Sequence, residues 1–162
     1  MIRAVKPPIA IAVCGAGQAD PQTASLAEQV GQVLARRGVR LVCGGLGGVM
    51  AAACRGAKSA GGMTIGILPG PDPADANTWV DVAIPTGLGN GRNLVIIYTA
   101  DGVLALPGNS GTLSEIAFGL KIGKPVVDLG GWGIPGMIPA PGGPEQAVQV
   151  LLGEISKRKA QS

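Results

Sequence analysis

Two charged residues beside glycine-rich turns, Arg92 and Glu115, could bind an anion and move a proton. Glu115 lies in the first turn of an expected helix, where it points toward the same sheet edge as the loop before it. A carboxyl group beside a bound sugar could accept hydroxyl hydrogen bonds or serve as a general acid or base. Arg92 follows the glycine-rich turn 87–91, and a guanidinium can hold a phosphate or carboxylate through two hydrogen bonds. The simpler alternatives are a carboxylate that complements the helix dipole and a surface ion pair.

Three glycine-containing loops, at 14–17, 44–50 and 107–112, each follow an expected strand and open an expected helix. At a helix N-terminus the backbone N–H groups are free and the dipole favours an anion, and glycine lets a phosphate approach closely. Three such loops at one sheet edge favour a phosphate site, although the glycines of the first loop could serve only turns and helix packing. The candidate ligand-binding residues are Gly15, Gly17, Gly44, Gly45, Gly48, Arg92, Asn93, Pro107, Gly108, Asn109, Ser110, Gly111 and Thr112.

Two common nucleotide-binding fingerprints are absent from these loops. No Gly-Lys-Ser/Thr follows the glycines, and Asp20 occupies the place of the third glycine in the dinucleotide fingerprint. A dinucleotide-dependent dehydrogenase is therefore disfavoured. The chain has no histidine, and Cys14, Cys43 and Cys54 have no metal-site spacing, so no metal site is expected.

Strand and helix signals alternate along the whole chain. Apolar runs rich in β-branched residues predict strands at 9–14, 39–43, 63–68, 80–84, 102–106 and 125–129, the last of them closing the sheet. Apolar residues at helical spacing predict helices around 26–34, 50–57, 90–99 and 113–120, and the Gly/Pro-rich segment 130–143 is expected to be irregular. This alternation predicts an α/β fold, a Rossmann-like parallel sheet flanked by helices, with ligands outside the carboxyl ends of the strands.

Size and composition fit a single phosphate- or nucleotide-binding domain over residues 1–162, with a core at about 8–129 and a closing helix at about 144–157. Apolar residues make up 46% of the chain and aromatic residues only 2%, so small and branched side chains must fill the core. The net charge of +3 and the few aromatic residues argue against nucleic acid as a partner. The odd number of cysteines favours a reduced, cytoplasmic protein, and no apolar segment is long enough to cross a membrane.

The segment 107–115 resembles the PGGxGTxxE signature of the Lonely Guy family, often mislabelled as lysine decarboxylases. The second loop, together with Gly61-Gly62 and the run 66–69, is similar to that family's GGGxxGLMG…GG…G(V/I)xP pattern, and the resemblance covers about 9–129. Enzymes of that family cleave the N-glycosidic bond of nucleoside 5'-monophosphates, such as AMP or cytokinin riboside monophosphates. The resemblance implies that Glu115 and Arg92 would be the catalytic residues.

The chain departs from that pattern at two positions. Asn109 replaces the second glycine of the signature, where the tolerance of Asn for positive φ would preserve the loop, and Asn93 replaces the lysine of an Arg-Lys pair. The segments 86–93 and 68–71 are more similar to a sister branch, the molybdenum cofactor carrier proteins and their bacterial relatives. That resemblance implies a protein that binds the phosphate of a molybdopterin without known catalysis.

Three functions remain open at this point. The favoured one is a binding or carrier protein for a phosphorylated, nucleotide-like small molecule, with the molybdenum cofactor as cargo and no other cofactor required. The alternative is a nucleoside 5'-monophosphate phosphoribohydrolase, so the sequence leaves open whether the chain is an enzyme. A sensor of nucleotide signals is the third. The resemblance also implies a homo-dimer or homo-tetramer, and segment 130–143 could cover the ligand or form an oligomer contact.

Overall fold

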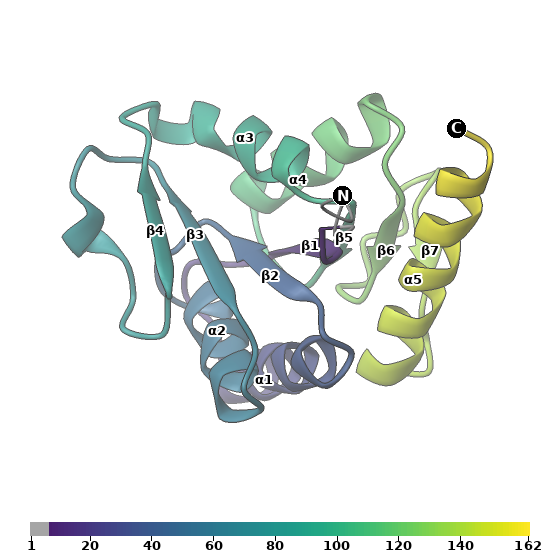
Figure 1. The fold of residues 1–162 in the computed structure, drawn as a ribbon, viewed down its shortest axis with the longest axis horizontal. Helices are drawn as coiled ribbons and strands as arrows, with labels where there is room; N and C mark the ends of the chain where they lie inside the picture. The colour runs from purple at the N-terminus through teal and green to yellow at the C-terminus, as the bar shows by residue number, and fades with distance from the viewer. Residues whose placement is uncertain (1–6) are drawn as a thin grey trace, which may run out of the picture.

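A seven-stranded, entirely parallel sheet forms the centre of the computed structural model, which describes residues 7–162 (Figure 1). The first six residues of the expected domain lie outside that range. The strands are β1 Ala10–Cys14, β2 Arg40–Cys43, β3 Thr64–Leu68, β4 Val82–Pro85, β5 Gly102–Ala105, β6 Val126–Asp128 and β7 Ile138–Pro139. Their spatial order is β4-β3-β2-β1-β5-β6-β7. The predicted α/β, Rossmann-like fold is confirmed.

Helices cover both faces of this sheet (Figure 1). One face carries α1 Pro21–Arg36, α2 Val49–Ser59 and α5 Pro144–Ala160, and the other carries α3 Arg92–Thr99 and α4 Ser110–Lys121. Two short 3-10 turns, Pro73–Asp75 and Gly89–Gly91, flank β4 in the chain.

The first strand shows how one apolar run serves two cores. Ile11 and Val13 are fully buried against the α1, α2 and α5 side, whereas Ala10, Ala12 and Cys14 face the α3 and α4 side. This alternation follows from the period of two along a strand. Along β1 the branched side chains therefore face one core layer and the small ones face the other, and both layers are built almost without aromatic residues.

Glycine lets α1 and α2 pack backbone against backbone. A Cβ on Gly31 of α1 would lie 2.0 Å from the carbonyl oxygen of Ala53, and a Cβ on Gly56 of α2 would lie 2.0 Å from that of Glu28. Asp20, which breaks the dinucleotide fingerprint, is the N-cap of α1, and its carboxylate accepts a hydrogen bond from the Thr23 amide at 2.7 Å. Asp20 is thus explained as the start signal of a helix.

The structure corrects three of the predicted elements. The strand expected at 80–84 begins two residues later, at Val82, and the helix expected at 90–99 begins at Arg92 after a 3-10 turn. The prediction that 125–129 is the last strand is wrong, because β7 pairs with β6 inside the segment expected to be irregular. β7 has only two residues, too few for a hydrophobic pattern, and Pro139 fits there because β7 is an edge strand.

The strand order places a topological switch point between β1 and β5. The chain builds β2, β3 and β4 outward on one side of β1 and then returns to place β5 on its other side, with Cys14 beside Ala105. Loops that leave β1 and β5 diverge there, which opens a crevice at the carboxyl ends of the strands. In residues 7–162 no helix is long and apolar enough to cross a membrane.

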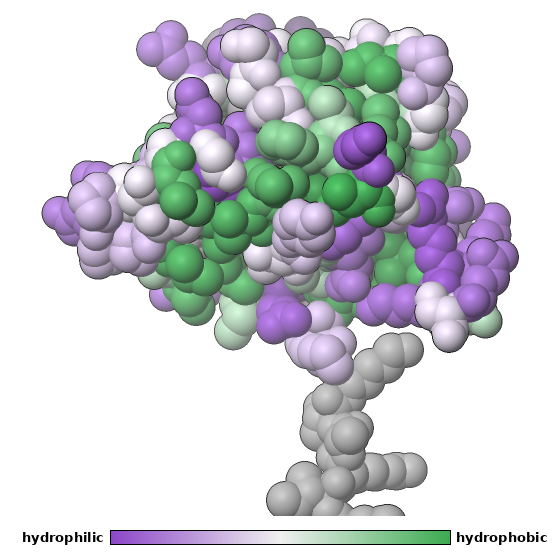
Figure 2. Space-filling model, turned by 90° about the horizontal axis from the view of Figure 1, so that it is seen from above, coloured by the Kyte–Doolittle hydropathy of each residue, from purple (hydrophilic) through white to green (hydrophobic). Residues whose placement is uncertain are grey.

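Apolar side chains gather on the outer surface of α3 and α4, as Figure 2 shows from above. Leu88, Tyr98 and Leu113 are 58%, 63% and 44% exposed, although all three are large and hydrophobic. We call these three residues the apolar face.

Candidate functional site

A cavity of about 270 Å³ opens at the carboxyl ends of the strands, at the switch point. Side chains or backbone from four segments line it: the loop after β1, the first turn of α2, the start of α3 and the start of α4. The lining residues are Gly15, Gly17, Met50, Asn90, Arg92, Asn93, Asn109, Gly111, Thr112 and Glu115. A second cavity of about 380 Å³ shares four of these residues and is lined by Asn90, Asn93, Asn109, Ser110, Gly111 and Ser114.

The Arg92 guanidinium contacts backbone carbonyl groups at the carboxyl ends of β2 and β3. Its Nε donates to the carbonyl oxygen of Ile67 at 2.9 Å, and Nη2 lies 3.5 Å from the carbonyl oxygen of Gly44. A Cβ on Gly44 would lie 2.6 Å from Nη2, so the loop can seat the guanidinium only because residue 44 is glycine. Arg92 is 8% exposed, which contradicts a surface ion pair. Burial lowers its pKa, an effect that Glu115 partly offsets, and an arginine keeps its charge.

Glu115 presents a buried carboxyl group to the same cavity. It is the sixth residue of α4, one turn further into the helix than expected, so it is no longer placed to complement the helix dipole. The side chain is 7% exposed, and burial raises its pKa to about 8 against the opposing effect of Arg92. Among the described residues no side chain forms an ion pair with Glu115. At neutral pH this group is therefore mostly a protonated acid that can donate a hydrogen bond.

The start of α4 is the candidate cradle for an anion. Asn109 is the N-cap: its side-chain oxygen accepts from the Gly111 amide at 3.3 Å, and its φ of −126° is extended. Asn109 therefore does not need the left-handed conformation for which the sequence analysis allowed. The Thr112 hydroxyl is buried, lines the cavity and has no hydrogen-bond partner. A Cβ on Gly108 would lie 2.1 Å from that hydroxyl oxygen, so the glycine leaves room for it.

Asn93 joins the starts of α3 and α4. Its amide nitrogen donates to Ser114 Oγ at 2.9 Å, and its amide oxygen accepts from Arg92 Nη1. Ser114 Oγ in turn donates to the carbonyl oxygen of Gly111 at 2.6 Å. An amide can accept from the guanidinium and donate to the serine at once, whereas a lysine at this position could only donate.

Nine of the predicted residues line the cavities and five do not. Those that line them are Gly15, Gly17, Arg92, Asn93, Asn109, Ser110, Gly111, Thr112 and Glu115, while Gly44, Gly45, Gly48, Pro107 and Gly108 lie behind them. Gly48, with φ +59°, lets the second loop lie against the first, and the adjacent Val49 amide donates to Ala16 at 2.9 Å. Met50, Asn90 and Ser114 also line the cavities, although they were not among the predicted site residues. All three lie in or beside the predicted glycine-rich segments, but only packing shows which side chains face inward.

The segment 130–143 is fixed beside the cradle and lines neither cavity. The Asp128 carboxylate accepts from the amides of Gly130, Trp132 and Gly133 at 3.0, 3.1 and 2.9 Å. The indole nitrogen of Trp132 donates to the carbonyl oxygen of Leu106 at 3.0 Å, at the end of β5. These bonds hold the segment against the strand that leads into the cradle.

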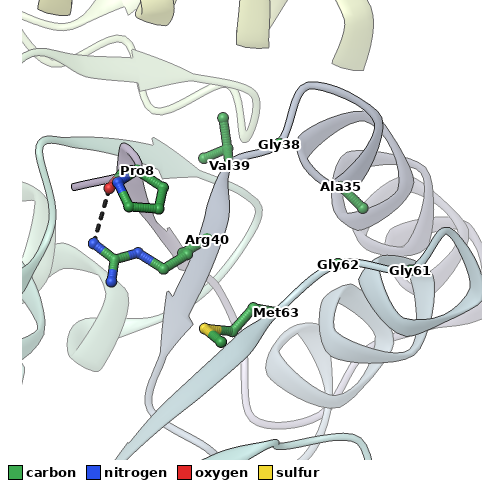
Figure 3. A pocket seen from close by; sticks show the side chains of 8 residues that line it. All are labelled: Pro8, Ala35, Gly38, Val39, Arg40, Gly61, Gly62 and Met63. Atoms are coloured by element: carbon green, nitrogen blue, oxygen red, sulfur yellow. Dashed lines mark hydrogen bonds between the residues drawn. The ribbon is translucent and has the colours of Figure 1, made fainter. Parts of the chain in front are cut away.

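Another pocket, of about 310 Å³, lies at the opposite edge of the sheet, where β2 and β3 begin (Figure 3). Its lining is mostly apolar, and its one charged side chain, Arg40, donates from Nη2 to the carbonyl oxygen of Pro8 at 2.8 Å. It contains no carboxyl group and no helix start. The chemistry predicted from the sequence is therefore concentrated at the carboxyl edge.

The candidate site thus combines an arginine, a protonated carboxyl group and a helix start at the switch point of a Rossmann-like sheet. The chain belongs to the SLOG cluster4 family, which matches residues 8–155. This result and the relatives below confirm the resemblance to the superfamily of Lonely Guy enzymes and molybdenum cofactor carriers.

Two solved structures and one enzyme illustrate the similarity. The molybdenum cofactor binding protein of Rippkaea orientalis is 37% identical with a TM-score of 0.84, and the match covers 94% of this chain and 99% of that one. The Moco carrier protein of Chlamydomonas reinhardtii is 34% identical with a TM-score of 0.81, covering 91% and 99%. The cytokinin riboside 5'-monophosphate phosphoribohydrolase of Mycobacterium tuberculosis is 33% identical over 132 residues, covering 74% of this chain and 69% of the enzyme.

Proposed function

We propose that this chain is a carrier that binds a phosphorylated, pterin-like small molecule, with the molybdenum cofactor as its cargo. The observation that carries the proposal is the free, buried Thr112 hydroxyl at the start of α4, in the same cavity as the fixed Arg92 guanidinium. A phosphate group would accept hydrogen bonds from the free amides of the helix start and from that hydroxyl. Arg92 would supply the opposite charge.

The adjoining cavity suits the rest of such a ligand. Its lining side chains are three asparagines and two serines, which offer donors and acceptors without a net charge. A heterocycle with ring nitrogens and oxygens can hydrogen-bond to such a surface. The described residues contain no cluster of His, Cys, Asp or Glu that would hold a metal ion, so the cargo would be held through its phosphate and ring.

The alternative is phosphoribohydrolase activity, and Glu115 is the observation that favours it. A buried carboxyl group with a pKa of about 8 beside a phosphate cradle is suited to general acid catalysis. The same protonation argues against a carboxylate that activates water or stabilises positive charge on a ribose. Together with Asn93 in place of lysine and the carrier relatives, this favours the carrier over the hydrolase.

The first experiment incubates the purified protein with AMP and related monophosphates and separates free base and ribose 5-phosphate by chromatography. For a carrier we expect binding of molybdopterin, measured by calorimetry, and no release of base. Release of base that disappears in Glu115→Gln would establish the hydrolase instead. If the protein shows no binding and no release of base, the proposal of a phosphate site is itself contradicted.

Thr112→Val tests the cradle directly. Valine has the shape of threonine without its hydroxyl, so we expect binding of a monophosphate to weaken about tenfold, the value of one hydrogen bond to a charged group. Stability should not fall, because the hydroxyl has no partner in the ligand-free protein. The matched control is Thr99→Val on α3, whose hydroxyl bonds its own helix at Val95. Equal affinity of both variants for the monophosphate would contradict the assignment.

A further inference from the structure

Two buried thiols are in contact beneath the second glycine loop. Cys43 is the last residue of β2 and Cys54 lies in α2, and their Sγ atoms are 3.6 Å apart. Both side chains are fully buried. A disulfide requires a separation of about 2.05 Å, so the two sulfur atoms need to move by about 1.5 Å to form one.

The surroundings make the two thiols unequal. The Cys54 thiol and the amide of Gly45, whose nitrogen lies 3.3 Å from Cys43 Sγ, stabilise a negative charge on Cys43, and they lower its pKa against the opposing effect of burial. Arg92 also lowers that pKa, whereas Glu115 raises it. The pKa of Cys54 is raised, chiefly because it donates to Cys43. Cys43 is thus the better nucleophile, and Cys54 is placed to resolve its oxidised form.

The third cysteine provides a contrast within the same protein. Cys14 ends β1 and is equally buried, but its thiol faces the carbonyl oxygen of Leu104 at 3.7 Å and not another cysteine. Burial is the main cause that raises its pKa, with Glu115 adding to it.

We propose that Cys43 and Cys54 are a redox-sensitive dithiol that hydrogen peroxide closes into an intramolecular disulfide. Each thiol loses its proton, the sulfur–sulfur bond forms, and the two electrons released reduce one peroxide molecule to two waters. Because both thiols are buried, the reaction depends on local opening of the loop between them. Peroxide, which is little larger than water, therefore reacts faster than a bulky disulfide such as oxidised glutathione.

The cross-link would act on the site through the loop it spans. Gly44, which follows Cys43, holds the Arg92 guanidinium through its carbonyl group, and Val49 at the start of α2 bonds to Ala16 in the first loop. Drawing α2 toward the end of β2 displaces both contacts. We expect the oxidised protein to bind a monophosphate about tenfold more weakly, as for one lost hydrogen bond to a charged group. This consequence rests on the proposed function, whereas the disulfide itself does not.

The test treats the full chain with peroxide, blocks remaining thiols under denaturing conditions and digests it with trypsin. Cys43 and Cys54 fall in one tryptic peptide, 41–55, and Cys14 falls in another. We expect peptide 41–55 to become lighter by two hydrogens and to resist alkylation, and dithiothreitol to reverse both changes. Alkylation of both thiols after peroxide, or a cross-link that includes Cys14 or a second molecule, would overturn the proposal.

Two variants complete the design. Cys14→Ser should still form the disulfide, whereas Cys54→Ser should leave Cys43 to oxidise alone. If Cys54→Ser fails to fold, the mass and alkylation of peptide 41–55 are compared between wild type and Cys14→Ser, with and without dithiothreitol. That comparison still tests whether the disulfide forms. AMP binding is then measured on both redox forms. If the disulfide is mapped but the affinity for AMP is unchanged, the proposed effect of oxidation on the site is contradicted. If the reduced form does not bind AMP, that result counts against the proposed function alone.

Discussion

At the scale of single residues, Glu115 makes the stability of the folded protein depend on pH. Its pKa is raised to about 8 by burial, while an unfolded chain has a glutamate near its usual value of 4.5. Between about pH 4.5 and pH 8, Glu115 is therefore protonated in the folded protein but ionised in the unfolded chain. The stabilising contribution of Glu115 is fully present below about pH 4.5 and is lost as the pH rises to about 8.

Glu115→Gln should remove this dependence. The amide stays neutral at every pH, so we expect the variant to lose less stability than the wild type between pH 5 and about 8. Urea unfolding at three pH values across that interval measures the effect. The control is Glu145→Gln, a carboxylate whose side chain is 62% exposed and which pairs with Arg37 at the surface. Parallel pH profiles for wild type and Glu115→Gln would show that this carboxyl group is ionised in the folded protein.

At the scale of elements, the contact between α1 and α2 positions the second glycine loop. Gly31 and Gly56 allow the two helices to meet at their backbones, and the start of α2 then bonds to the loop after β1. The glycines of this region therefore serve packing, and through packing they hold the cavity wall.

Gly31→Ala tests that contact. The new Cβ would lie 2.0 Å from the carbonyl oxygen of Ala53, so the helices must separate, and we expect a loss of about 1–3 kcal/mol in the free energy of unfolding. Gly153→Ala in α5 is the control with the opposite sign: nothing lies within 4 Å of its Cβ position, and alanine in a helix gains about 0.5–1 kcal/mol. Urea unfolding of both variants measures the difference. A neutral Gly31→Ala would mean that the helices slide apart without cost.

The elements also show what the sequence could and could not predict. The run 9–14 was predicted as a strand because six consecutive apolar residues satisfy both faces of a covered sheet. Helix α4 was predicted from the apolar spacing at 113–120, but it begins earlier, at Ser110, because Asn109 is its N-cap. β7 was not predicted, since it exists only through its pairing with β6. The burial of Arg92 could not be predicted from the sequence either, because the carbonyl groups that bind it belong to two strand ends that are far from it along the chain.

At the scale of the whole molecule, the apolar face lies beside the site, with Tyr98 on α3, Leu113 on α4 and Leu88 in the turn before α3. Leu88, Tyr98 and Leu113 expose large hydrophobic side chains, which is characteristic of a surface that a protein partner covers. We propose that a second copy of the chain covers this face. The starts of α3 and α4 would then lie near the interface.

Tyr98→Glu with Leu113→Glu should dissociate the oligomer, because four carboxylates would face one another in a two-fold dimer. Sedimentation velocity at micromolar concentration measures the change from oligomer to monomer. Gln22→Glu with Gln149→Glu is the matched control, since both side chains are exposed on α1 and α5, which cover the other face of the sheet. A monomeric wild type, or a double variant that sediments as the wild type does, would contradict an interface on this face.

The position of Trp132 gives the molecule an optical probe of its own. The chain has two tryptophans, and the indole of Trp132 is bonded to the last carbonyl group before the Pro107–Thr112 loop. The other, Trp79, lies under the Arg55 guanidinium at 5.4 Å, on a separate part of the fold. With Trp79→Phe, the remaining emission would come from one ring at the border of the cradle. Its fluorescence would report the arrival of a ligand in real time, without a label on either molecule.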